Sequence, residues 1–249
     1  MTSSVTAAPH PADTTVRHAF PYDALPRAIF DADEAPMAPA PQRFITDTTF
    51  RDGQQARAPF TPEQVLHIYD LLHRLDNGTG TVRQCEFFVY SDAERATVRR
   101  CRERGYRYPE VTAWIRARPE DLQLVRELGV AETGLLTSVS DLHISHKLGL
   151  SRQQAMERYL QVVDAALDAG LRPRCHFEDV TRADIPGFVV PFAAALMERG
   201  LAAGTPVKIR LCDTMGVALP WPAATLPRGV PKLVRALTRD AGVPPAQLE

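Results

Sequence analysis

Ile45-Thr46-Asp47-Thr48-Thr49-Phe50-Arg51-Asp52-Gly53-Gln54-Gln55 is a strand-like segment that stops abruptly in an Arg-Asp-Gly turn. Thr and Phe favour strands, and glycine allows the sharp exit that follows. A guanidinium and a carboxylate therefore stand side by side where a buried strand ends. Such an Asp can bind a divalent metal, and such an Arg can stabilise an oxyanion. Taken alone, the same residues could equally form a surface Asp-Gly turn.

From Phe44 onward, apolar strand-like runs alternate with helix-like stretches. Thr61-Pro62-Glu63 is typical of a helix start, because threonine can cap a helix and proline suits its first position. The expected strands are 44–46, 85–90, 110–115, 132–139, 172–177 and 207–211. The first expected helix starts at residue 61. The other expected helices cover residues 93–104, 119–128, 151–169, 186–199 and 230–241.

This alternation predicts an α/β fold with a parallel sheet covered by helices. A doubly wound sheet and a closed (β/α)₈ TIM barrel are the two main options. No glycine-rich dinucleotide loop follows any expected strand, which favours the barrel. We assign residues 43–249 to a partial TIM barrel containing about the first six β/α units. Residues 1–42 are expected to be a disordered or arm-like extension.

Bulk composition excludes several classes of protein. The 29 basic and 30 acidic residues nearly cancel, so no broad basic face for nucleic acid is expected. We find no apolar run long enough to cross a bilayer and no secretory signal, so no membrane partner is expected. The four cysteines are widely spaced without a CxxC pair, which predicts a reducing, cytoplasmic location.

Polar groups accompany five of the six expected strands, mostly at the carboxyl end, where a barrel builds its active site. Arg51 and Asp52 follow the first strand. Glu86 stands inside the apolar second strand, which is costly unless the acid is paired or bound to metal. The remaining candidates at these ends are His143, His146, Glu178, Thr181, Arg182 and Thr214.

Simpler interpretations exist for each of these residues. Glu86 could reach the surface at a strand edge, and Thr214 could only stabilise a turn. Asp179, Thr181 or Asp184 could cap the next helix, although capping requires a single such residue. His143 and His146 resemble a metal pair, but we favour a loop in which one of them contacts substrate.

Four stretches together resemble the motifs of the DRE-TIM metallolyase superfamily. They are residues 47–55, 140–148, 178–182 and 213–216, and they occur in the order of the synthase branch. That superfamily includes isopropylmalate, homocitrate and citramalate synthases and hydroxymethylglutaryl-CoA lyases. TTFRDGQQAR, RQCEFFVYSD, EVTAWIRA, RPRCHFEDVTRAD and KIRLCDTMGV are most similar to the Re-citrate synthase group and to 2-phosphinomethylmalate synthase.

The resemblance implies a metal-dependent acyltransferase that performs a Claisen condensation of acetyl-CoA with a 2-oxo acid. Oxaloacetate or an analogue such as phosphinopyruvate is the expected acceptor. The metal would be Mn²⁺ or Mg²⁺, with Co²⁺ as a further option, and the protein would be a cytoplasmic homodimer. The alternatives are an isopropylmalate or homocitrate synthase, or a related acyl-CoA lyase.

The resemblance also implies residue roles. Asp52 would be a metal ligand, and Arg51 would stabilise the enolate or the developing alkoxide. Glu86 and Glu178 would be catalytic or position ligands in the polar ring around metal and substrate. The implied substrate-binding residues are Gln55, His143, Thr181, Arg182 and Thr214, with His143 and Arg182 facing the distal group of the keto acid.

One departure from the family concerns the metal. The family binds it with Asp plus a His-x-His pair after strand seven, and the sequence contains no His-x-His. We therefore expect the chain to be a truncated piece, unstable or inactive alone, because an open barrel exposes unpaired strand edges. A non-catalytic fragment is the corresponding alternative.

Overall fold

The described part of the chain, residues 29–56 and 58–249 of a computed structural model, contains one all-parallel sheet of six strands. The strands follow one another in sequence order, from β1 to β6. In a doubly wound sheet the strand order reverses at a central strand, whereas in a barrel the strands follow one another in sequence order, as they do here. The strands are β1 (Ile45–Asp47), β2 (Val82–Phe87), β3 (Glu110–Arg116), β4 (Glu132–Ser138), β5 (Arg172–Glu178) and β6 (Lys208–Cys212).

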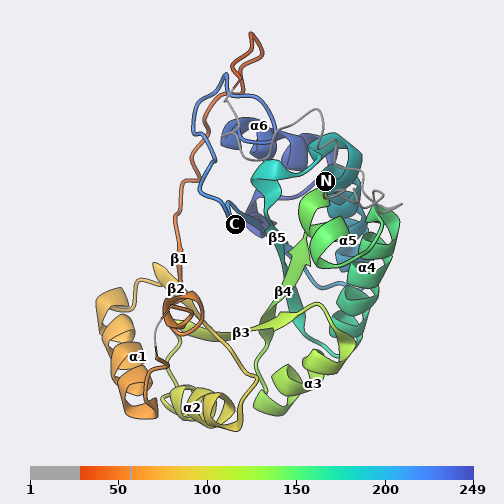
Figure 1. The fold of residues 1–249 in the computed structure, drawn as a ribbon. Helices are drawn as coiled ribbons and strands as arrows, with labels where there is room; N and C mark the ends of the chain where they lie inside the picture. Colours follow the sequence, from red (N-terminus) through yellow and green to blue (C-terminus); the bar gives the residue numbers. More distant parts are fainter. Residues whose placement is uncertain (1–28, 57) are drawn as a thin grey trace, which may run out of the picture.

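Helices follow the strands and cover the outer side of the curled sheet (Figure 1). The partial TIM barrel predicted from the sequence is thereby confirmed. Among the strands, the expected boundaries shift most at β2, which begins at Val82 and not at residue 85. The helices are α1 (Pro62–Asp76), α2 (Asp92–Glu103), α3 (Pro119–Leu128), α4 (Arg152–Asp168), α5 (Val190–Ala202) and α6 (Val230–Arg235).

The predicted start of α1 is confirmed in detail. The Thr61 hydroxyl accepts a hydrogen bond from the Gln64 N–H at 3.3 Å, and the Gln64 side chain accepts one from the Thr61 N–H at 2.9 Å. This reciprocal capping box satisfies two backbone donors that the helix itself leaves unpaired. The same device begins α2 at Ser91 and α4 at Ser151.

Three segments are wound as π-helical turns, which the sequence did not predict. Leu142–Lys147 was expected to be a loop, and Ile185–Val189 and Ala236–Asp240 were expected to be ordinary helix. A π-helical turn carries an extra residue per turn and is found frequently at functional sites. The first of these turns lies directly after β4, at the carboxyl edge of the sheet.

One stretch corrects the expectation that no apolar run could cross a bilayer. Ile185–Ala203, with 19 residues and a mean hydropathy of 1.3, meets that test by length and composition. Its apolar side chains pack against the sheet, however. Phe192 is fully buried and stacks on Phe177 of β5 with 5.2 Å between ring centroids. The stretch therefore behaves as a covering helix of the barrel.

The two faces of the sheet differ sharply in polarity. Phe177 and Leu135 belong to the fully buried hydrophobic core, which includes side chains of the covering helices. Arg174, His176 and Thr112, which alternate with them, turn inward and are also buried. Because successive strand side chains point to opposite faces, the inner positions of neighbouring strands gather into one polar interior.

The segment before β1 reaches across to α6 (Figure 1). Phe30 pairs with Ala224 in an antiparallel bridge, and Asp31 forms an ion pair with Lys232 of α6. The expectations for residues 1–28 lie outside the described residues. At the other end of the chain, Leu248 pairs in parallel with Ile209, so residues 248–249 extend the sheet beyond β6.

We predict that Gly134→Ala destabilises the fold. A Cβ at Gly134 would lie 2.7 Å from His176 Nε2 and 2.8 Å from Trp114 Cδ1. Overpacking of this kind costs about 1–3 kcal/mol, which urea denaturation would measure. Gly53→Ala is the control, because its added Cβ would meet Thr49 at an ordinary 3.6 Å. Equal stability of Gly134→Ala and the unmodified protein would contradict this packing.

Candidate active site

Arg51 and Asp52 lie together just after β1, as the sequence predicted. Arg51 Nη1 donates to Asp52 Oδ1 at 2.8 Å, and Nη2 lies 2.7 Å from Oδ2. The guanidinium also stands over the Trp114 ring at 5.3 Å, and its Nε faces Glu86. The Arg51 side chain is 12% exposed, whereas that of Asp52 is 49% exposed. The cation is thus held from several sides while the carboxylate remains open.

Arg51 retains donors for a ligand. A guanidinium has five N–H groups in a planar fork. Nη1 uses one of them to donate to Asp52, whereas Nη2 and Nε form ion-pair contacts with Asp52 and Glu86. The second N–H on Nη1 and on Nη2 can therefore donate to an oxygen placed beside the fork. This is the geometry that an oxyanion-stabilising arginine requires.

Glu86 is fully buried and surrounded by cations. One carboxylate oxygen faces Arg51, while the other contacts Arg174 and lies 3.4 Å from Arg210 Nη1 and 3.4 Å from His176 Nε2. Burial alone would raise the pKa of Glu86. The contact with His176 and the charges of Arg174 and Arg51 lower it by more than burial raises it, so the pKa lies well below its ordinary value. Glu86 is therefore an anchor for Arg51 and a poor proton acceptor.

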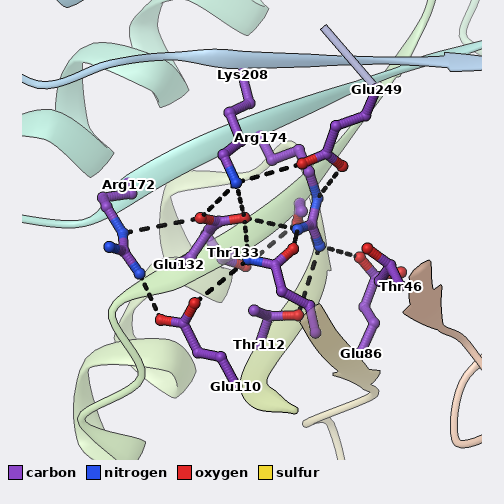
Figure 2. A network of polar contacts seen from close by, with 12 residues as sticks. Thr46, Glu86, Glu110, Thr112, Glu132, Thr133, Arg172, Arg174, Lys208 and Glu249 are labelled. Carbon is purple, nitrogen blue, oxygen red and sulfur yellow. Dashed lines mark hydrogen bonds and ion pairs between the residues drawn. The ribbon is translucent and has the colours of Figure 1, made fainter. Parts of the chain in front are cut away.

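The Arg174 guanidinium occupies the centre of the polar interior (Figure 2). Its Nη1 donates to Glu132 Oε1 at 2.6 Å and its Nη2 contacts Glu86. Lys208 Nζ lies 3.2 Å from Glu132 Oε2 and 3.3 Å from Glu249 Oε1. Acids and bases thus alternate through the barrel interior, which removes most of the penalty for burying either charge alone.

His176 lies beside Glu86 in the polar interior of the barrel. The imidazole is fully buried, and burial lowers its pKa to about 4 despite the neighbouring Glu86 carboxylate, which acts to raise it. His176 is therefore neutral near pH 7. Because the ring is neutral, the neighbouring arginines are the groups that balance the negative charge of Glu86.

A second cluster forms around Glu178, where β5 ends. Lys147 Nζ donates to both carboxylate oxygens at 2.9 and 3.0 Å, and His143 Nδ1 lies 3.1 Å from Oε2. The Ser138 hydroxyl also donates to Glu178. Burial raises the pKa of Glu178, but the bonds from His143, Ser138 and Lys147 lower it to about 2. The π-helical turn after β4 thereby places His143 and Lys147 on one carboxylate.

The remaining predicted residues are engaged in different ways. Gln55 Nε2 lies 3.5 Å from Asp52 Oδ1, beside the first cluster. Thr181 is buried and donates to Asp213 at 2.8 Å, and Arg182 donates twice to Asp179 at 2.7 Å. Thr214 Oγ1 accepts the Asp179 N–H at 2.9 Å. Thr181 therefore joins the segments after β5 and β6, Arg182 bonds within the segment after β5, and none of these bonds involves Arg51 or Asp52.

The two clusters meet around Cys212 of β6. Cys212 pairs with Glu178 in the sheet register, and the charges of Arg51, Glu86 and Glu178 influence the pKa of its thiol. Burial raises the pKa of this thiol to about 12. Cys212 is therefore protonated at neutral pH and is not an activated nucleophile.

Sequence reasoning assigned no role to several residues that shape this site. Trp114 supports Arg51, and its indole N–H is buried without a hydrogen-bond partner. Arg174, Arg210 and Lys147 provide the charges that hold Glu86 and Glu178. A signal was present, because charged residues recur at alternate positions of β5 and β6, which marks an inward polar face.

The described residues do not complete a metal site. Among them, no group of three or more His, Cys, Asp or Glu side chains could hold a metal ion. Asp52 offers one accessible carboxylate, and both of its oxygens already contact Arg51. A single carboxylate is less than the ligand set that a divalent cation requires.

Comparison with known families and proteins gives a consistent picture. The HMGL-like family model matches residues 43–239. Citrate (Re)-synthase of Syntrophus aciditrophicus is 55% identical over 94% of this chain and 37% of its own length. Citrate (Re)-synthase of Clostridium kluyveri is 46% identical over 92% of this chain and 51% of its own length. 2-Phosphinomethylmalate synthase of Streptomyces hygroscopicus is 40% identical over 92% and 53%, respectively. The chain thus spans about half or less of the length of these relatives.

Solved structures share the fold at lower identity. Hydroxymethylglutaryl-CoA lyase from Pseudomonas aeruginosa has a TM-score of 0.59 at 18% identity, covering 83% of this chain and 66% of that one. HMG-CoA lyase from Brucella melitensis has a TM-score of 0.54 at 20% identity, covering 84% and 71%. These likenesses establish the barrel architecture.

We predict that Glu86→Gln strongly destabilises the protein. The amide would remove the one carboxylate that Arg174 and Arg51 share and leave Arg174 with Glu132 and Arg51 with Asp52, and breaking a buried ion pair costs about 3–5 kcal/mol. Chemical denaturation at pH 7 measures this loss. Glu63→Gln is the matched control, because Glu63 is 74% exposed and its ion pair with Arg100 lies on the surface. Equal effects of the two substitutions would contradict the anchoring role.

We also predict a pH dependence that His176 causes. Its pKa is about 4 when folded against 6.5 ordinarily, so the unfolded chain binds the proton first. The stability it contributes is complete above pH 6.5 and is lost as the pH falls toward 4, by about 3 kcal/mol. In denaturation curves, His176→Gln should flatten the slope between pH 6.5 and 5, whereas exposed His67→Gln should leave it. An unchanged slope in the first variant would refute this assignment.

Proposed function

The chain belongs to the HMGL-like family, and from that premise we propose that it is the catalytic half-barrel of an acyltransferase. The reaction would be a Claisen condensation of acetyl-CoA with a 2-oxo acid. Oxaloacetate or a phosphinyl analogue is the proposed acceptor, because the relatives most similar in sequence are named citrate (Re)-synthase and 2-phosphinomethylmalate synthase. The observation that carries the proposal is the Arg51–Asp52 pair at the carboxyl end of β1, anchored by Glu86.

Arg51 would stabilise the charge that develops during condensation. A base removes a proton from the methyl group of acetyl-CoA, the resulting enolate carbon attacks the keto carbon, and the electron pair of the carbonyl moves onto its oxygen, which then takes up a proton. The free N–H groups on Nη1 and Nη2 would donate to that alkoxide. Because Glu86 and Trp114 already fix the guanidinium, little reorganisation accompanies the reaction. Water then hydrolyses the thioester and releases CoA.

The cluster after β4, β5 and β6 would bind the keto acid. We propose that the Thr214 hydroxyl donates a hydrogen bond to the carboxylate next to the keto group, because the Asp179 N–H holds its oxygen in place and its own donated bond to the Cys212 carbonyl is long, at 3.5 Å. His143 and Lys147, both held on Glu178, would face the distal anionic group. Gln55 would contribute from beside Asp52. Glu178 would act by orienting these two side chains, because it remains ionised.

Asp52 is our proposed ligand for a divalent metal, Mn²⁺ or Mg²⁺. Its open carboxylate and oxygen chemistry suit such an ion. The described residues do not supply the further ligands. That observation favours a second candidate function, in which this chain binds a 2-oxo acid but does not catalyse the condensation by itself. A homodimer and a cytoplasmic location remain part of the proposal, and all four cysteines are free.

CoA release tests the proposed function. We expect thiol release from acetyl-CoA that requires both Mn²⁺ and oxaloacetate, and a loss of about 10²-fold or more in Arg51→Lys, because lysine lacks the fork. Arg100→Lys is the control, since Arg100 pairs only at the surface with Glu63.

Binding separates the two candidates. Calorimetric binding of oxaloacetate that weakens in Arg51→Lys, without CoA release in any 2-oxo acid tested, would favour the non-catalytic candidate. A folded protein that neither releases CoA nor binds a 2-oxo acid would overturn both.

A further inference from the structure

Asp179 has an unusual backbone conformation for a buried acid. It follows β5 directly, its φ is 64° and its ψ is 34°, and it is fully buried. The left-handed region is uncommon for residues other than glycine, because it is energetically unfavourable for them. Surrounding contacts must therefore determine this conformation.

The contacts of Asp179 reach three consecutive loops. Its Oδ2 accepts the Ser140 hydroxyl at 2.6 Å, from the segment after β4. Both carboxylate oxygens accept from Arg182 at 2.7 Å, within the segment after β5. Its backbone N–H donates to Thr214 Oγ1 at 2.9 Å, in the segment after β6. One residue thus joins the carboxyl ends of three neighbouring strands.

The left-handed turn also separates two adjacent acids. Glu178 takes the inward position of β5, where Lys147 and His143 hold it. Asp179 then bends the chain, so that its N–H faces Thr214 while its carboxylate points into the packed loops. His143 Nε2 lies 3.9 Å from Asp179 Oδ2, which is too long for a hydrogen bond.

A purely stabilising ion pair explains these contacts poorly. Arg182 alone would satisfy the Asp179 charge with two parallel hydrogen bonds. Buried ion pairs are in any case weak contributors to stability. The additional bonds to Ser140 and Thr214 instead fix where the neighbouring loops stand relative to β5.

We propose that Asp179 is a positioning residue that sets the keto-acid subsite, acting through Thr214. Its carboxylate contacts hold the left-handed backbone, and that backbone aims the N–H at Thr214 Oγ1. The Asp179 N–H thereby fixes the position of the threonine oxygen, and the hydroxyl proton, whose acceptor is the Cys212 carbonyl at a long 3.5 Å, can turn to the ligand. This inference rests on the proposed function, because it assumes that Thr214 binds the 2-oxo acid.

A double-mutant cycle on oxaloacetate affinity tests the proposal. Asp179→Asn keeps the size of the side chain and tolerates the left-handed region, but it loses the charge that holds Arg182. We expect it to weaken oxaloacetate binding about tenfold, as Thr214→Val does, with no further loss in the double variant. Asp184→Asn is the matched control, because this acid of the same segment pairs with Arg152.

Unfolding curves on the same samples separate positioning from stability. If Asp179→Asn fails to fold, Ser140→Ala provides the test, since it removes a single bond to the Asp179 carboxylate. Affinity unchanged in Asp179→Asn, or losses that add in the double variant, would overturn the inference alone. An unmodified protein that binds no 2-oxo acid would overturn the proposed function, and the inference with it.

Discussion

The carboxylate of Glu86 is the constraint on which the rest of the site depends. It is fully buried, with Arg51 on one oxygen and Arg174 on the other. A buried anion is stable only among cations that compensate for its lost hydration. These cations come from the turn after β1 and from β5. The position of Arg51 therefore depends on how the side chains of the barrel interior pack around Glu86.

The polar interior also links the two ends of the curled sheet. Barrel interiors are usually filled by branched apolar side chains, whereas here acids and bases alternate from strand to strand (Figure 2). Arg210 Nη2 donates to Thr46 of β1 at 3.0 Å and to Glu249 beyond β6 at 2.6 Å. One side chain thereby spans the interior between the first strand and the residues after the last. This contact favours the curvature that brings the strand ends together.

Local signals predicted much of the fold. The range of α3 was predicted residue for residue, because a proline starts it and Gly129 in the left-handed region ends it. Pairing of Glu86 was one of the options that the sequence left open, beside metal binding and an exit to the surface, since an acid in an apolar strand requires compensation. The identity of its partners could not be predicted, because Arg174 lies 88 residues away and only the curled sheet brings it near.

Other features of the site depend on geometry that a sequence does not display. Nothing local distinguishes the π-helical turn Leu142–Lys147 from a loop, yet it places His143 and Lys147 on one carboxylate. Thr181 and Arg182 have the residue types expected of ligand contacts, but their partners are Asp213 and Asp179. Which polar residue faces the site and which joins loops is decided by the turn after β5.

The charge state of Glu86 tests this account most directly. In a protein labelled with ¹³C, the carboxyl carbon of Glu86 would be followed by NMR while the pH is lowered from neutrality through the ordinary glutamate pKa of about 4.3. Because Arg51 and Arg174 hold this group ionised, the account predicts the chemical shift of a carboxylate throughout, for as long as the protein remains folded. A midpoint at or above the ordinary value would mean that the cations do not enclose Glu86, and it would contradict the anchoring of Arg51.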